Sequence, residues 1–324
     1  MITPKLPDIC SCDVEDKEQL ALYRRCRERW LSWILGDDEH AIGKQITQII
    51  WDDAIFRTLN EARRIAAESP GRHFNSDLLS LLDRGFVTAQ VMALRRLTDP
   101  GFHDPKKEVV SLVRLLKDID SNRDLLTREH YICYDGTPFC PSEGELDMRS
   151  DRERMNKRFD QLSGTSRECR SRKDCVKENI INKVIQSLKV CDDFRDYANK
   201  FVAHAAAPSP SRERIREESR ITLDKFNQAH RAVIRAASFV GADILFESTL
   251  GRVPAPLYNH LEHLDKPLVL SSDSKRLKEF WHARVKEVDG WSEDRLSEYI
   301  DEPGSSLKEI DRGGLGSLPP LSTL

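Results

Sequence analysis

The sequence predicts an all-α protein, built as an antiparallel helical bundle with an irregular insertion and a small helical C-terminal appendage. Apolar residues recur at three- and four-residue steps over most of the chain, which is the period of a helix with one buried face. Pro and Gly fall between these periodic segments and end them. Charged residues make up 32% of the chain and the mean hydropathy is -0.55, which fits long helices with solvated outer faces.

Five helices are expected before residue 131. Gly36 ends the first, Ser69-Pro70-Gly71 ends the second, and Asp99-Pro100-Gly101 ends the third. Ser76 and Asp77 are candidate caps of the third helix, because their side chains can accept hydrogen bonds from its first amides. The expected ranges are 16–35, 39–68, 76 to about 98, 106–119 and 121–130.

The rest of the chain is expected to complete the bundle and to end in a tail. Residues 131–169 are rich in turn residues and Pro, with a helix-compatible segment at 149–162. Ser211 can cap one long last helix of the bundle, which ends before Gly251. The predicted ranges are 1–14 for an irregular lead-in, 15–250 for the bundle, 251–302 for a linker with short helices at 275–288 and 292–300, and 303–324 for a disordered tail. Deleting 303–324 is expected to leave the thermal midpoint unchanged.

The charges of the chain are nearly balanced. A net charge of -3 provides no global basic field, so nucleic-acid binding would need a local patch. The most basic stretch is 149–174, where nine cations stand against five anions, and nine minus five is +4. This stretch is either a solvated charged face or an arm that follows phosphates beside the site.

Composition also bears on compartment and cofactors. The chain lacks the run of about eighteen apolar residues that a membrane span needs and lacks a signal-peptide core, which predicts a cytoplasmic protein. Its eight Cys are scattered and are expected to stay reduced in that compartment. Neither Cys10-x-Cys12 nor the pair Cys133 and Cys140 matches a repeated zinc pair, and no Gly-rich phosphate loop is present. We therefore expect no metal site and no cofactor.

The segment 170–207 is expected to be the central helix, with an apolar stripe along its length and a Pro just beyond its end. Near that end, Tyr197, Lys200, Phe201 and His204 are spaced i, i+3, i+4 and i+7, so they share one face if the helix persists. An ammonium and an imidazole one turn apart form a candidate anion or phosphate site. The two aromatic residues continue the apolar stripe, which favours a place in the core over a base-stacking role.

Two short motifs suggest a family. Asn199-Lys200-x-x-x-His204, near the end of a segment of long helices, resembles the signature of the HEPN superfamily, an all-α group of nucleotide-binding and RNA-cleaving domains. The stretch from Val87 to Asp99 is similar to a helix end in the abortive-infection AbiU-type branch of that superfamily. Together the resemblance covers about residues 15–250.

The resemblance implies a function and partners. It implies a metal-independent RNA endonuclease or RNA-binding protein in phage defence or in a toxin system. It also implies a homodimer in which two motif helices face each other. The partners that the resemblance implies are RNA and a cognate antitoxin or defence protein.

Chemistry assigns roles to the motif residues. An imidazole can take the 2′-hydroxyl proton of RNA near neutral pH, which makes His204 the candidate general base or acid. Lys200 would neutralise charge on the phosphoryl oxygens, with Arg195 second, although Lys lacks the bidentate fork of Arg. Arg195 lies almost opposite His204 on a straight helix, nine residues away. Asn199 either hydrogen-bonds a phosphate or satisfies backbone groups at the helix end.

One position departs from the family pattern. The family usually has Arg six residues before the His, and this position is Ala198. Either Arg95 or Arg96 crosses the bundle to supply the missing cation, or these residues form an exposed helix end with an Arg–Asp99 pair. Restoring Arg at 198 is expected to create activity if only the cation is missing.

Three functional hypotheses therefore stand side by side. The first is the nuclease. The second is a catalytically inactive HEPN-like bundle that acts as a binding or assembly module, which the departure at Ala198 favours. The third is an unrelated helical scaffold, in which His204 is a helix-end residue favoured by the helix dipole.

Overall fold

The computed structural model describes residues 6–68, 75–101, 109–139, 146–203, 208–218, 220–259, 261–262, 264, 266 and 271–291. The chain divides into two compact units, 1–257 and 258–324. The described residues contain helices and a single isolated bridge, between Thr127 and Cys175, and they contain no sheet. The all-α prediction is therefore confirmed.

Side chains at the helix starts satisfy the first amides of the long helices. Asp16 accepts hydrogen bonds from Glu18 and Gln19 at the start of α1 (Lys17–Leu35). Asn75 accepts one from Leu78 at the start of α3 (Ser76–Leu97). The prediction that Ser76 or Asp77 caps this helix was one residue or more too late.

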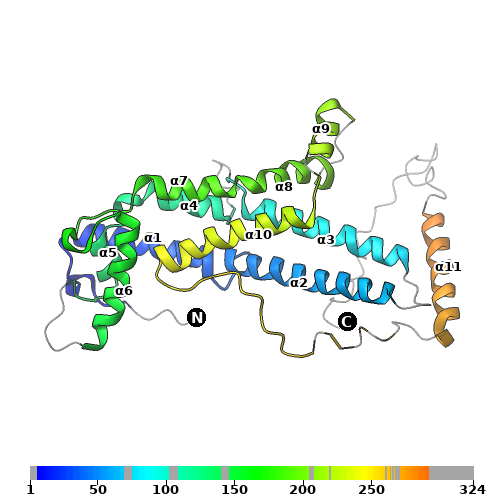
Figure 1. Cartoon of the computed structure of the whole chain (residues 1–324), viewed down its shortest axis with the longest axis horizontal. Helices are drawn as coiled ribbons and strands as arrows, with labels where there is room; N and C mark the ends of the chain where they lie inside the picture. The colour runs from blue at the N-terminus through cyan, green and yellow to red at the C-terminus, as the bar shows by residue number, and fades with distance from the viewer. Residues whose placement is uncertain are drawn as a thin grey trace, which may run out of the picture. The chain divides into compact units, whose positions relative to one another are not determined.

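The long helices of the first unit run along one common direction in Figure 1. The helices α1 and α2 (Ile42–Ala67) contact each other, and α3 packs on α2 and on α8 (Asp192–Tyr197). The helix α10 (Leu223–Ser238) contacts α2, α3 and α7 (Glu178–Ser187). One continuous core joins them, with aromatic side chains in its middle: Phe56, Phe86, Phe194 and Phe226.

The expected irregular insertion contains a helix and adjoins a deeply buried one. The helix α6 (Leu146–Ser163) lies within it, and α5 (Arg128–Cys133) ends at its beginning. All six residues of α5 are buried, including Arg128, Glu129 and His130. The helix α4 (Leu112–Ser121) starts later than predicted, at a cap formed by the Ser111 hydroxyl.

The single helix predicted for 170–207 is wrong. Residues 170–177 form a non-helical segment, which is extended except for a turn at 172–173. Val176 in this segment is buried, and the Arg128 and Glu129 amides donate hydrogen bonds to the carbonyls of Asp174 and Arg172. The helical part begins only at Glu178. Its hydrogen-bonding pattern changes from α-helical to 3-10 and back to α-helical along the segment. Tertiary pairing of residues 170–177 with α5 has overridden their helical periodicity.

The single last helix predicted after Ser211 is also wrong. It is divided into α9 (Pro210–Glu218) and α10, and the Thr222 hydroxyl accepts a hydrogen bond from the Lys225 amide to start α10. A π-helical turn, Phe239–Ile244, continues α10. In the second unit, α11 (Ser274–Gly290) corresponds to the helix predicted at 275–288. The predicted helix at 292–300 and the tail at 303–324 lie outside the described residues.

Candidate functional site

The motif segment is the end of a helix whose winding changes three times. It passes from α7 through a 3-10 turn (Leu188–Cys191) into α8, and then into a π-helical turn (Ala198–Val202). The Ala203 amide donates to the Ala198 carbonyl at 2.7 Å, which is the five-residue step of a π-helix. A π-helical turn has more residues per turn than an α-helix, so the α-helical spacing that was expected to place Lys200 on the face of Tyr197 and Phe201 does not apply across this turn.

The structure describes three of the four predicted site residues. Asn199 and Lys200 are neighbours in the π-helical turn, and both are half-buried. Within the part of the chain that is described, Lys200 forms no ion pair. His204 lies outside the described residues, so the predicted imidazole–ammonium pair is not placed.

The fourth predicted residue, Arg195, is engaged by carboxylates on its own helix. Its Nη1 lies 3.0 Å from Asp192 Oδ1, and its Nε lies 3.9 Å from Asp196 Oδ1. These are local pairs at three- and one-residue spacing. Arg195 is thus held along α8.

Ala198 faces the protein interior. Its exposed fraction is 0%, and it belongs to the hydrophobic core. The π-helical turn that contains it packs against α3. An Arg here would place a guanidinium in the core, so the expectation that this position lacks only its cation is not supported by the packing.

The aromatic residues of the motif pair with each other. The rings of Tyr197 and Phe201 lie 5.0 Å apart, and Tyr197 packs against the core. The guanidinium of Arg212, on α9, lies 5.6 Å from the centre of the Phe201 ring. The Arg212 contact stacks a cation on Phe201 from the following helix.

The cations at the end of α3 form no hydrogen bond or ion pair with any described residue of the motif segment. Arg95 is half-buried and Arg96 is exposed, and among the described residues neither forms an ion pair. The Asp99 carboxylate instead accepts a hydrogen bond from the Gly101 amide at 2.8 Å. The predicted Arg–Asp99 pair is therefore wrong, because Asp99 satisfies the turn that follows the helix.

The basic stretch 149–174 is largely neutralised by the fold. Its excess of cations was counted along the sequence, but several of its partners come from other segments. Among the side chains that the structure describes, five of its cations form ion pairs: Arg154 with Asp151, Arg158 with Asp243, Arg170 with Asp160 and Glu153, Arg172 with Asp13 and Glu129, and Lys173 with Glu15.

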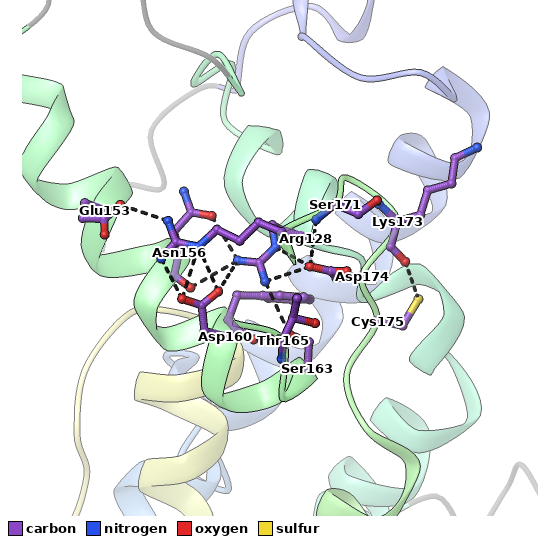
Figure 2. A network of polar contacts seen from close by, with 12 residues as sticks. Arg128, Glu153, Asn156, Asp160, Ser163, Thr165, Ser171, Lys173, Asp174 and Cys175 are labelled. Carbon is purple, nitrogen blue, oxygen red and sulfur yellow. Dashed lines mark hydrogen bonds and ion pairs between the residues drawn. The ribbon is translucent and has the colours of Figure 1, made fainter. Parts of the chain in front are cut away.

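A buried arginine, which sequence reasoning missed, is the centre of a network of polar contacts (Figure 2). Arg128 is 0% exposed, and its guanidinium lies between Asp160 and Asp174, with a nitrogen 2.9 Å from an oxygen of each. It also donates to the Asn156 side chain at 3.0 Å and lies over the Phe159 ring. The cluster joins α5, α6 and the non-helical segment 170–177.

The carboxylates of this cluster are fully engaged. Burial would raise the pKa of Asp160, but hydrogen bonds from Arg170 and the charge of Arg128 outweigh it and hold that pKa below its ordinary value. The same hydrogen bonds raise the pKa of Arg170. Because each charge faces an opposite one, we interpret the cluster as a clamp that holds the insertion on the bundle.

A second missed residue is His230, on the buried face of α10. Its Nε2 donates to Gln90 Oε1 at 2.9 Å, since the Gln90 amide nitrogen already donates to the Ile49 carbonyl. Burial lowers the pKa of His230, Arg57 acts in the same direction and Asp53 opposes both. Through Gln90, this core histidine links α10 to α3 and α2. In the sequence, His230 stands among apolar residues at helical spacing, and this position could have indicated its burial.

Comparison with known families, curated proteins and solved structures finds no match for this chain. Among the residues described, no three His, Cys, Asp or Glu side chains gather in a way that could hold a metal ion. None of the helices described is both long enough and apolar enough to cross a membrane.

Proposed function

We propose that this protein is a HEPN-like helical bundle without catalytic activity that acts as a binding or assembly module. The observation that carries the proposal is the complete burial of Ala198. The position that supplies Arg to the site in the family pattern is part of the hydrophobic core in this chain. Arg195, the nearest upstream alternative, is paired with Asp192 and Asp196.

The charge distribution supports the same proposal. A protein that holds RNA through phosphates needs cations that are available to the ligand. The most basic stretch of this chain has most of its cations paired within the fold, and the net charge is -3. A protein partner fits these observations better than a phosphate backbone.

Metal-independent RNA cleavage is the second candidate, and one observation favours it. Lys200 lies in a π-helical turn, a form that is frequent at functional sites, and it is free of carboxylate partners among the described residues. It could therefore face a phosphate, with Asn199 beside it and His204 as the proton carrier.

Incubation of the purified full chain with several structured and unstructured RNAs, with and without EDTA, separates the two candidates. The proposed module leaves the RNAs intact under both conditions. Cleavage that His204→Ala abolishes and EDTA does not affect would establish the nuclease instead, because loss of proton transfer costs about 10²–10⁴ in rate. Lys200→Ala should then lower the rate, whereas Lys189→Ala, an exposed cation on an earlier turn, serves as the matched control.

A further inference from the structure

The N-terminal half of α3 has an apolar surface that the first unit does not cover. Leu78, Leu81 and Leu82 are 44%, 58% and 40% exposed. The buried residues of α3 begin only at Phe86. In Figure 1 this half of α3 runs beside α2, beyond the end of α10. Three neighbouring leucines in water are unfavourable unless another surface covers them.

These leucines form a stripe with helical spacing. Leu78 and Gly85 are seven residues apart, so they lie on nearly the same line along the helix. Leu81 and Leu82 lie between them along the axis, one on each side of that line. A Cβ added at Gly85 would meet no atom within 4 Å. Packing within the chain therefore does not require a Gly there, although Gly weakens a helix interior. A Gly in the stripe would let a second helix approach closely.

Two unpaired charges of opposite sign flank one edge of the stripe. Asp77 and Arg84 are exposed, and neither has a hydrogen bond or ion pair with any described residue. They are seven residues apart, so they lie on the same edge, separated by about 10.5 Å along the axis. Charges at such edges select the partner and orientation of paired helices.

This pattern is complementary to itself in the antiparallel sense. When two copies of a helix pair antiparallel about a two-fold axis, the same edge of the stripe meets on both copies. If the two-fold axis passes midway between residues 77 and 84, Asp77 of one copy lies opposite Arg84 of the other. The same symmetry places Arg84 of the first copy opposite Asp77 of the second, so the interface contains two such pairs. Leu81 then lies beside the axis, and Leu78 lies level with the leucines of the partner. A parallel pairing does not bring these two charges together.

We propose that the surface formed by Leu78, Leu81, Leu82 and Gly85, flanked by Asp77 and Arg84, binds a second copy of this chain with the two α3 helices antiparallel. The interface uses a face of α3 that is separate from the motif segment. It does not depend on the proposed function, because a nuclease could form it as readily as an inactive module.

Charge exchange in the full chain tests the proposal, with sedimentation velocity at micromolar concentration as the measurement. The wild type should be a dimer. Asp77→Arg and Arg84→Asp each replace two attractive pairs by two repulsive ones, so each should weaken the homodimer by on the order of ten-fold or more. Leu81→Asp should abolish it. Circular dichroism should be unchanged in each variant, because all three side chains are exposed.

Mixing and double exchange provide the decisive controls. A mixture of the two single variants should form a heterodimer of wild-type affinity, because one copy then has two cations and the other two anions. The double variant Asp77→Arg, Arg84→Asp should dimerise with itself. A monomeric wild type would overturn the proposal. So would single variants that dimerise like the wild type, or folded variants that do not recombine. RNA cleavage is measured in a separate experiment. Failure of the dimer proposal can therefore be told apart from failure of the proposed function.

Discussion

Individual residues of this protein take their roles from burial more than from residue type. Arg128 and Arg195 are both arginines flanked by carboxylates, but Arg128 is completely buried and Arg195 is partly exposed. A buried ion pair that loses one partner leaves an uncompensated charge, whereas an exposed pair is replaced by water. The two sites therefore differ in their contribution to stability.

Arg128→Ala is expected to lower the free energy of unfolding by about 3–5 kcal/mol, because it removes the cation that pairs with Asp174 and leaves Asp160 with Arg170 alone. Urea denaturation followed by circular dichroism measures the change. Arg64→Ala is the matched control, since Arg64 is an arginine with two carboxylate partners on the surface. Its loss should cost at most about 1 kcal/mol. If Arg128→Ala lowered the free energy of unfolding no more than Arg64→Ala does, the buried cluster would not stabilise the fold.

The same cluster predicts a dependence on pH. The pKa of Asp160 is lower in the folded state than its ordinary value of 3.8, so its ionised form favours folding. This contribution is fully present above that ordinary value and is lost as the pH falls through the lower, folded-state pKa. The free energy of unfolding should decrease below about pH 4 in the wild type and less steeply in Asp160→Asn. Identical slopes would contradict the assignment.

Ala198→Arg should destabilise the fold and should not create RNA cleavage. The residue is 0% exposed, and the free energy of unfolding should fall by about 3–5 kcal/mol for an unpaired buried charge. Ala203→Arg is the control, because Ala203 is exposed just beyond the π-helical turn and should change stability by less than about 0.5 kcal/mol. New nuclease activity in a stable Ala198→Arg protein would revive the missing-cation hypothesis.

At the scale of elements, helix ends decide how the chain is divided. The segment 211–250 reads as one amphipathic helix, but it is split into α9 and α10, and Thr222 caps the second. A hydroxyl acceptor at this position satisfies an amide that otherwise has no partner within the helix. The cap thus fixes where α10 begins, and the apolar positions that follow it determine which face is buried.

Thr222→Ala should lower the free energy of unfolding by about 1 kcal/mol, because the Lys225 amide loses its acceptor. Thr222→Ser retains the hydroxyl and should recover most of that loss. Chemical denaturation of the two variants and the wild type gives the comparison. An equal loss in Thr222→Ser would place the effect in the Thr methyl group rather than in the cap.

At the scale of the whole molecule, the first unit has its own core. The buried hydrophobic cluster runs from Cys12 to Leu245, with partly buried neighbours as far as Leu250. The exposed apolar residues of α11, such as Phe280 at 70% and Trp281 at 66%, belong to the other unit. Folding of the first unit should therefore require only its own residues.

A chain that ends at Leu257 should retain the thermal midpoint of the full protein within about 2 °C, as a thermal melt followed at 222 nm would show. Deleting only 303–324, which lies outside the described residues, is expected to have no effect either. A large fall in the midpoint of the 1–257 fragment would mean that the second unit stabilises the first.

The sequence by itself determined the fold class and the approximate positions of several long helices, because the periodicity of apolar residues is a local property. It also predicted a site at Arg195, Asn199, Lys200 and His204, which stays a prediction because His204 lies outside the described residues. It could not determine that 170–177 is not helical, because its backbone partners on α5 are more than forty positions away. It could not identify Arg128, whose partners Asp160 and Asp174 come from two other segments. The tertiary structure alone decided that Ala198 is buried, since a change to π-helical winding and packing on α3 determine which way that residue faces.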